Sequence, residues 1–260
     1  MESKKTVMIT GANQGIGFAT AKKLLQLGHY HVYIGSRNQE NGENAKKDLE
    51  KLGFSDFDIV QIDVTDKNTI TSTVEKLEGT ITHLDILINN AGISGALRIN
   101  KSAAEGEPFM EQDITTIPLK EVRKVFDVNF FGAIEVTQSF LPLLQKAPSP
   151  KIINISSGLG SLTNHTDPEA PYYEHMKGIK LGAYNTSKTA LNAFTVMLAA
   201  QLQDTSFQIN SVSPGFAATN LNNYSGTQNP SEAVDSIIEF VTMGDKGPTG
   251  KFFEKEEIAW

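Results

Sequence analysis

Short runs of β-branched and other apolar residues alternate along this chain with longer amphipathic stretches. Such alternation is typical of a parallel sheet whose strands are joined by helical crossovers. The pattern predicts an α/β fold with a doubly wound sheet of seven mostly parallel strands and helices on both faces. The expected strands are residues 6–10, 31–35, 58–62, 85–89, 151–155, 208–212 and 251–253.

Helical periodicity fills the gaps between these strands. One apolar face ends at Gly28 and consists of Ile16, Ala19, Leu24 and Leu27. A second apolar face begins a long helix that runs past Asn129, and it consists of Val122, Val125, Phe126, Val128 and Phe131. Apolar residues at intervals of three and four predict helices with one buried face, so we expect these residues, and aromatic residues such as Phe130, in the core.

The domain organisation follows from length and from the absence of linkers. The chain has 260 residues, without an internal repeat or a linker rich in Gly, Ser or Pro. Single α/β domains often reach about 250 residues, so we expect one domain over residues 1–260, with an inserted segment at about 158–183. Two long polar segments, 93–119 and 158–183, follow expected strand ends. Ligands of open α/β sheets bind at the carboxyl ends of the strands, so these segments are expected to form the walls of a site.

Charge and cysteine content exclude several classes of function. The chain has 23 Lys and Arg residues against 30 Asp and Glu residues, a formal net charge of −7. A nucleic-acid partner is not expected, because binding to phosphates needs a basic surface. The absence of cysteine excludes disulfides, thiolate metal sites and cysteine nucleophiles. The five histidines have no metal-ligating spacing, so no metal is expected, although His165 and His175 are open as pocket residues.

No targeting or membrane segment is visible. The first residues are polar and lead into an apolar stretch of only residues 7–9, whereas a signal peptide has an apolar core of about 7 to 15 residues. No segment approaches the ~20 apolar residues that span a bilayer. We therefore expect a cytoplasmic protein that does not bind membranes.

The segment between the first expected strand and helix is rich in glycine and contains Gly11, Gly15 and Gly17. Glycines at such a turn allow the backbone to approach a pyrophosphate closely, and a helix N-terminus offers free N–H groups to it. The spacing favours dinucleotide binding, with a merely tight turn as the alternative.

At this point the sequence resembles the short-chain dehydrogenase/reductase family, which has a Rossmann-type fold. The family signature Thr-Gly-x-x-x-Gly-Ile-Gly is matched at Thr10, Gly11, Gly15, Ile16 and Gly17. The resemblance continues with an acid after the third strand, Asp63, and with Asn-Asn-Ala-Gly after the fourth. It implies that the cofactor is bound by Asn13, Gln14, Asp63, Val64, Asn90, Ala91 and Gly92, together with the glycine loop.

The end of the second expected strand bears on the choice of cofactor. It carries Ser36 and Arg37. An acid there would bind the ribose 2′-hydroxyl and repel a 2′-phosphate, whereas an arginine can hold that phosphate. We expect NADP(H), with NAD(H) possible. One departure from NADP-preferring relatives is Gln14, where many of them carry a basic residue.

Tyr184 and Lys188 lie at positions i and i+4 of an expected helix, so they share a face. A cation near a phenol favours the phenolate and lowers its pKa, as a general acid or base near neutral pH requires. Taken alone, this spacing also fits an ordinary surface pair. In the family, however, the same two residues act in catalysis together with an asparagine and a serine, which match Asn129 and Ser157 here; Ser156 is the less favoured serine.

The resemblance implies a mechanism and further contacts. Ser157 and Tyr184 would bind the substrate carbonyl oxygen, Lys188 would bind the nicotinamide ribose, and Asn129 would hold a water that links the lysine to solvent. Pro214, Gly215 and Thr219 match a segment that contacts the nicotinamide carboxamide. Residues 220–230 are a polar stretch that matches either a mobile substrate lid or a plain surface loop.

The 26 residues between Ser157 and Tyr184 resemble the longer connection of monomeric carbonyl reductases, as do residues 247–253, Trp260 and Asn13. We therefore expect a monomer, with a dimer or tetramer open. The expected activity is NADPH-dependent reduction of ketone or aldehyde substrates to alcohols. The alternatives are a sugar-nucleotide epimerase or dehydratase, whose relatives carry an added substrate domain, and a non-catalytic NADP-binding sensor or scaffold.

Overall fold

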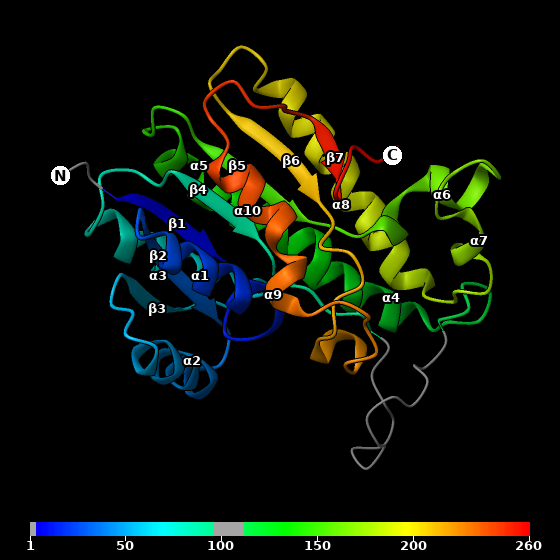
Figure 1. Ribbon diagram of the computed structural model, residues 1–260, viewed down its shortest axis with the longest axis horizontal. Coiled ribbons are helices and arrows are strands. Elements are labelled where there is room, and N and C mark those ends of the chain that lie inside the picture. Colours follow the sequence, from blue (N-terminus) through cyan, green and yellow to red (C-terminus); the bar gives the residue numbers. More distant parts are fainter. Residues whose placement is uncertain (1–3, 96–111) are drawn as a thin grey trace.

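The computed structural model describes residues 4–95 and 112–260 (Figure 1). Within them, one sheet has the strand order β3-β2-β1-β4-β5-β6-β7, and all neighbouring strands pair in parallel. The doubly wound α/β sheet expected from the sequence is thereby confirmed. The strands are β1 (Lys5–Ile9), β2 (Tyr30–Ser36), β3 (Phe57–Gln61), β4 (Ile86–Asn89), β5 (Lys151–Ile155), β6 (Gln208–Val212) and β7 (Lys251–Phe253).

Helices cover both faces of the sheet, and each face has its own apolar core. On one face the core includes side chains of α1 (Gly15–Leu27), α2 (Gln39–Lys51) and α10 (Asp235–Thr242). On the other it includes side chains of α3 (Lys67–Glu78), α5 (Gly132–Leu144) and α8 (Gly182–Gln201). The remaining elements are α4 (Leu119–Phe126), η1 (Asp127–Phe131), η2 (Gly158–Gly160), α6 (Leu162–Thr166), α7 (Tyr173–Met176), η3 (Asn220–Asn222) and α9 (Pro230–Ala233).

The central strands β4, β5 and β6 are buried at every residue, as expected for parallel strands covered on both faces. Their polar side chains pair with one another and with the helices. Asn89 Nδ2 donates to Asn154 Oδ1 at 2.8 Å, and Asn154 Nδ2 donates to Thr195 Oγ1 at 2.8 Å. The Thr195 and Ser211 hydroxyls are also hydrogen-bonded, at 2.8 Å. Because Thr195 lies on α8, this network fixes α8 against the sheet.

Two of the residues expected in the core are exposed. Leu27, in the last turn of α1, is 38% exposed, and Phe131 is 54% exposed. The reason at Phe131 is a π-helical turn, η1, which follows α4 and precedes α5. A wider turn shifts the phase of the helix, so the buried side chain is Asn129 and Phe131 points outward against the rings of Phe126 and Phe130.

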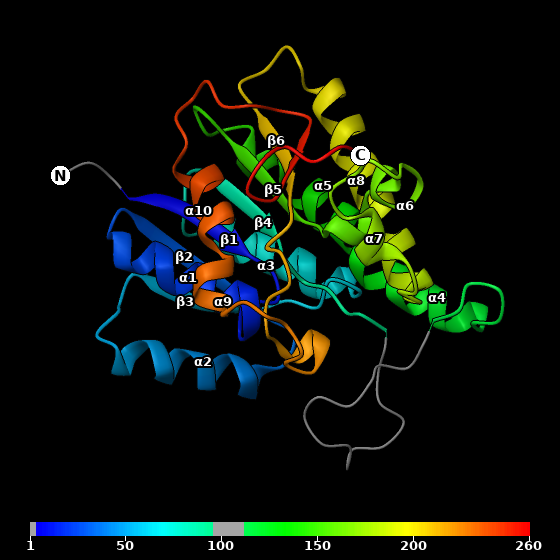
Figure 2. The same ribbon diagram turned by 45° about the vertical axis from the view of Figure 1, so that its right-hand side comes forward.

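The inserted segment 158–183 packs against the end of the chain. It contains η2, α6 and α7, and in Figures 1 and 2 the C-terminus lies beside α6. Thr163 donates to the carbonyl oxygen of Trp260 from its backbone N–H at 2.9 Å and from its hydroxyl at 2.8 Å. The indole of Trp260 stacks on Phe252 of β7. The insertion is therefore tied to the sheet edge through the last residue.

Of the other long segment, 93–119, residues 96–111 lie outside the described residues. In the part of the chain that the structure describes, no helix is long and apolar enough to cross a membrane.

Candidate active site

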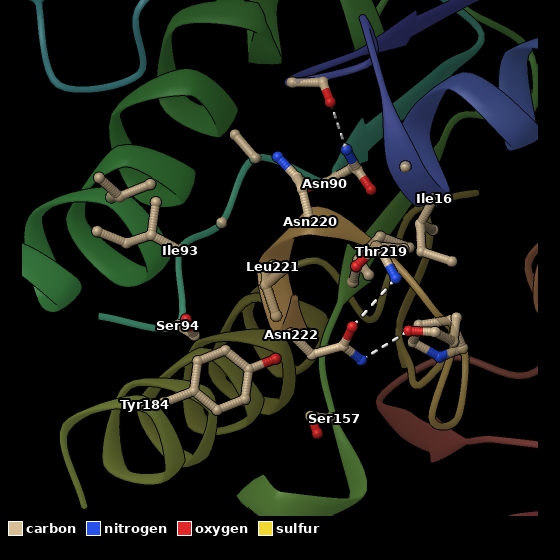
Figure 3. A pocket seen from close by; sticks show the side chains of 18 of the residues that line it. Ile16, Asn90, Ile93, Ser94, Ser157, Tyr184, Thr219, Asn220, Leu221 and Asn222 are labelled. Carbon is tan, nitrogen blue, oxygen red and sulfur yellow. Dashed lines mark hydrogen bonds between the residues drawn. The ribbon is translucent and has the colours of Figure 1, made fainter. Parts of the chain in front are cut away.

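A cavity of about 330 Å³ opens at the carboxyl ends of the strands (Figure 3). It collects most of the residues that the sequence singled out. They are Gly11, Asn13, Gln14, Gly15, Ile16, Arg37, Asp63, Val64, Asn90, Ala91, Gly92, Ser157, Tyr184, Lys188, Pro214, Gly215 and Thr219. Three predicted residues, Gly17, Ser36 and Asn129, do not line it.

The glycine loop fits a bound pyrophosphate. Gly11 and Gly15 have φ of 61° and 59°, a region that residues with a Cβ rarely adopt. A Cβ on Gly11 would also lie 2.9 Å from the Cα of Ala91. No side chain caps the N-terminus of α1, so its first N–H groups are left for an anion. These features match the cradle that a dinucleotide phosphate requires.

Gly17 supports this loop from behind. A Cβ there would lie 2.4 Å from Asn90 Nδ2 and 2.8 Å from the Cα of Ala12. Asn90 needs that space because its Nδ2 donates to the carbonyl oxygens of Thr10, at 2.8 Å, and Gly11, at 3.0 Å. Gly17 therefore packs helix against loop.

Arg37 and Asp63 lie together at the end of the cavity formed by β2 and β3. Arg37 Nε is 3.9 Å from Asp63 Oδ2, and the arginine side chain is 74% exposed. The guanidinium thus lies beside the site and is largely open to solvent, which suits a phosphate. Ser36 is buried, and its hydroxyl donates to the carbonyl oxygen of Asn38 at 2.7 Å. The structure therefore does not bring Ser36 into the cavity.

Ser157, which follows β5, and Tyr184 and Lys188 of α8 line the same cavity. Tyr184 is 8% exposed and Lys188 is 4% exposed. The Lys188 Nζ is 5.8 Å from the centre of the Tyr184 ring. Figure 3 shows the Tyr184 hydroxyl pointing into the cavity. Ser157 is the serine that faces this group, since the hydroxyl of Ser156 donates to Asn192 Oδ1 at 2.7 Å.

The pKa values in this cluster are set mainly by burial. Burial raises the pKa of the Tyr184 phenol to about 12, and a hydrogen bond with Ser157 opposes that rise. Burial lowers the pKa of the Lys188 ammonium to about 8. Burial therefore outweighs the hydrogen bond at Tyr184, because loss of hydration disfavours the phenolate; the expectation that Lys188 lowers the pKa of Tyr184 stays a prediction. A phenol with this raised pKa is protonated at neutral pH, as an ordinary tyrosine is, and stays so further into the alkaline range.

Asn129 is buried in the π-helical turn η1, and its side chain forms hydrogen bonds with Ile93 and Ser187. Its Oδ1 accepts from the backbone N–H of Ile93 at 2.8 Å, and its Nδ2 donates to the Ile93 carbonyl oxygen at 2.9 Å. The same Nδ2 donates to Ser187 Oγ at 3.0 Å. Asn129 thus links η1, the segment after β4 and α8, and holds Ile93 at the cavity wall.

The cavity wall also contains residues that the sequence did not single out as lining residues. They are Ile93, Ser94, Val128, Leu159, Leu181, Phe216, Ala217, Asn220, Leu221 and Asn222. Most are apolar and come from irregular segments, where no periodicity marks a lining position. His165 and His175 are not among the lining residues; His165 Nε2 instead contacts the carbonyl oxygen of Leu159 at 3.0 Å.

Of residues 220–230, expected as a lid or a plain loop, the first three form η3 at the cavity wall. η3 carries Asn220, Leu221 and Asn222, and all three line the cavity. Asn222 Oδ1 accepts from the backbone N–H of Thr219 at 3.0 Å, and its Nδ2 donates to the carbonyl oxygen of Ala217 at 2.7 Å (Figure 3). This segment is therefore a built part of the wall.

Comparison with known proteins agrees with this geometry. A family model described as short chain dehydrogenase matches residues 5–230. The short-chain dehydrogenase anuI of Penicillium roqueforti is 34% identical over 265 residues, covering 99% of this chain and 98% of that protein. The structure of salutaridine reductase from Papaver somniferum is 28% identical, covers 96% of this chain and 100% of that one, and superposes with a TM-score of 0.80.

An NADPH-bound carbonyl reductase from chicken fatty liver is 27% identical, covers 100% of both chains and has a TM-score of 0.78. The likeness thus extends over the whole sheet and over the cavity at its carboxyl edge. The chain belongs to the short-chain dehydrogenase family.

Proposed function

We propose that this protein reduces ketones and aldehydes to alcohols with NADPH, and that Tyr184 is the general acid. The observation that carries the proposal is the arrangement of the cavity, whose lining includes Arg37 after β2 and the Ser157 and Tyr184 hydroxyls after β5 and on α8, with β5 three strands from β2 in the sheet. The glycine loop lies in the same cavity. A nicotinamide dinucleotide phosphate would reach from one end to the other, and relatives named as reductases support the same activity.

Different residues would bind different parts of this cofactor. The uncapped N-terminus of α1 and the glycine loop would hold the pyrophosphate. Arg37 would hold the 2′-phosphate, and no acid stands at the end of β2 to repel it. Lys188 would bind the nicotinamide ribose, and Pro214, Gly215 and Thr219 would border the carboxamide.

When bound, the nicotinamide would supply a hydride for the carbonyl carbon. As the carbon–oxygen π pair moves to the oxygen, Ser157 donates a hydrogen bond to that oxygen and Tyr184 transfers its phenolic proton to it, which yields the alcohol. The cationic Lys188 stabilises the phenolate that remains, and a proton from solvent restores the phenol. Asn129 supports this cluster through Ile93 and Ser187; its role in holding a water stays a prediction.

The alternative of a non-catalytic NADP-binding sensor needs none of this chemistry at Tyr184. Placement of a protonated phenol and a serine hydroxyl in the cavity favours the enzyme. The monomeric state and the cytoplasmic location remain predictions from the sequence.

The test is the loss of absorbance of reduced cofactor with a panel of neutral ketones and aldehydes. The wild-type protein should oxidise NADPH in the presence of such a substrate. Tyr184→Phe should lower kcat by about 100- to 10,000-fold, the usual contribution of a general acid, while NADPH binding measured by fluorescence titration stays unchanged. Tyr173→Phe is the matched control, because Tyr173 does not line the cavity. Full turnover by Tyr184→Phe would contradict the proposal.

A further inference from the structure

The catalytic candidate Tyr184 lies in the first turn of its helix. Gly182, Ala183 and Tyr184 are the first three residues of α8. Backbone N–H groups at these positions have no partner within the helix, so a first turn frays unless something caps it. The residue before the helix, Leu181, provides no side-chain cap. A tyrosine that must deliver a proton to one defined point therefore needs support from elsewhere in the chain.

That support comes from Gln112, which is 72 residues away in the sequence. The Oε1 of Gln112 accepts from the backbone N–H of Tyr184 itself at 3.1 Å. The backbone carbonyl oxygen of Gln112 accepts from the N–H of Gly182 at 2.9 Å. Two of the unpaired donors of α8 are thus satisfied by one remote residue.

The nitrogen of the Gln112 side-chain amide contacts the segment that follows β4. Its Nε2 donates to the carbonyl oxygen of Ser94 at 2.6 Å. Ser94 lines the cavity and lies beside Tyr184 in Figure 3. Gln112 is only 1% exposed, so water does not compete for these hydrogen bonds. One buried amide therefore sets the distance between Tyr184 and the segment after β4.

Two glycines leave the room that Gln112 occupies. A Cβ on Gly95 would lie 2.8 Å from Gln112 Nε2, and a Cβ on Gly182 would lie 2.9 Å from the Gln112 carbonyl oxygen. Contacts that short do not occur for real Cβ atoms. The backbone of Gln112 also donates to the carbonyl oxygen of Lys180 at 2.6 Å. Gln112 is thus hydrogen-bonded to Lys180 just before α8, to the first turn of α8 and to Ser94 after β4.

We propose that Gln112 is a positioning residue for Tyr184: it caps the first turn of α8 and fixes the phenol relative to the Ser94 wall of the substrate site. The inference rests on the proposed carbonyl reduction. Gln112 does not line the cavity, so it acts through Tyr184 and Ser94. A shift of about 1 Å at a reacting group can cost up to about 100-fold in rate.

The test replaces Gln112 with methionine, which has a similar length and makes neither hydrogen bond. For Gln112→Met we expect kcat to fall about 10- to 100-fold, while KM for NADPH stays unchanged because the glycine loop and Arg37 are untouched. The control is Asp66→Ala, which removes the side-chain cap of α3 at Asn68 N and does not line the cavity. Asp66→Ala should lower Tm about as much as Gln112→Met does, and it should leave kcat unchanged.

Hydrogen exchange measured by mass spectrometry tests the same proposal without turnover. A peptide that covers the first turn of α8 should exchange faster in Gln112→Met than in wild type. If that variant does not fold, Gly182→Ala disturbs the same cap from the other side and should give the same pattern. Wild-type kcat in a folded variant, or unchanged exchange in that peptide, would overturn the role of Gln112. A wild-type protein that reduces no carbonyl compound would refute the proposed function instead, and hydrogen exchange would then decide the cap alone.

Discussion

The Lys188 ammonium donates a hydrogen bond of 2.7 Å to the backbone carbonyl oxygen of Ile155, the last residue of β5. This bond joins α8 to the strand that leads directly into Ser157, so the serine and the lysine are held as one unit. An ammonium has three donors, and Lys188 also lines the cavity. Two donors are therefore left for the hydroxyls of a bound ribose.

The pH dependence of reduction follows from the two shifted groups. Reduction needs a protonated Tyr184 and a charged Lys188. Because the pKa of Lys188 is about 8 and that of Tyr184 about 12, the lysine is the first to lose its proton as pH rises. We expect kcat/KM for NADPH, which reports ionisations of the free enzyme, to be level near neutral pH and to fall through about pH 8. A profile without a break between pH 7 and 9 would contradict this assignment.

The preference for NADPH should depend on Arg37. Arg37→Ala removes the charge that faces a 2′-phosphate, and a hydrogen bond to a charged group contributes about 1.5–3 kcal/mol. We expect KM for NADPH to rise about 10- to 100-fold and KM for NADH to stay unchanged, as measured by initial rates with each cofactor. Arg123→Ala, on α4 and outside the cavity lining, is the matched control. An equal loss with both cofactors would argue against a phosphate contact.

The position of η3 at the cavity wall should depend on Asn222. Asn222→Ala removes the hydrogen bonds to Thr219 and Ala217 and frees η3, which places Leu221 in the wall. KM for the carbonyl substrate should therefore rise more than KM for NADPH. Asn229→Ala, which removes the cap of α9 in the same segment, should leave both KM values near wild type. Equal KM values in wild type and Asn222→Ala would show that the loop is held by other contacts.

Stability should depend on Lys151, a buried lysine at the far end of β5. Its Nζ donates to the carbonyl oxygens of Phe240 and Val241, both at 3.1 Å, and to that of Met243. Lys151→Met leaves these three acceptors without a donor, and one unsatisfied buried group costs about 1–3 kcal/mol. The free energy of unfolding in urea should fall by about 2 kcal/mol. Lys146→Met, at an exposed position, should have little effect.

The same lysine should make the unfolding free energy depend on pH in a predictable direction. Burial, with the nearby charge of Lys5, lowers the pKa of Lys151 in the folded protein to about 8 from 10.5. Between these values the unfolded chain binds more protons, so the contribution of Lys151 to stability rises with pH. The difference in unfolding free energy between wild type and Lys151→Met should therefore widen as pH is raised through that window. A constant difference would mean that the ammonium keeps its ordinary pKa in the folded protein.

Strand positions and the glycine loop were predictable because their signals are local. Gly11 and Gly15 are needed for a left-handed backbone, and that need is visible in the spacing of the sequence itself. Tyr184 and Lys188 were predictable for the same reason, since a helix places residues four apart on one face. The phase of the helix at Phe131 was not, because a π-helical turn shifts the periodicity by an amount that residue patterns do not record.

By itself, the sequence determined the doubly wound sheet, the glycine loop and the choice of Ser157, Tyr184 and Lys188, which line one cavity. Only the tertiary structure decided that Ser36 turns away from the cavity, that burial raises the pKa of the Tyr184 phenol, and that Gln112 caps the helix on which that tyrosine lies. The physical reason is that these three outcomes depend on hydration and hydrogen-bond partners, and those are contributed by residues far apart in the chain that meet only when it folds.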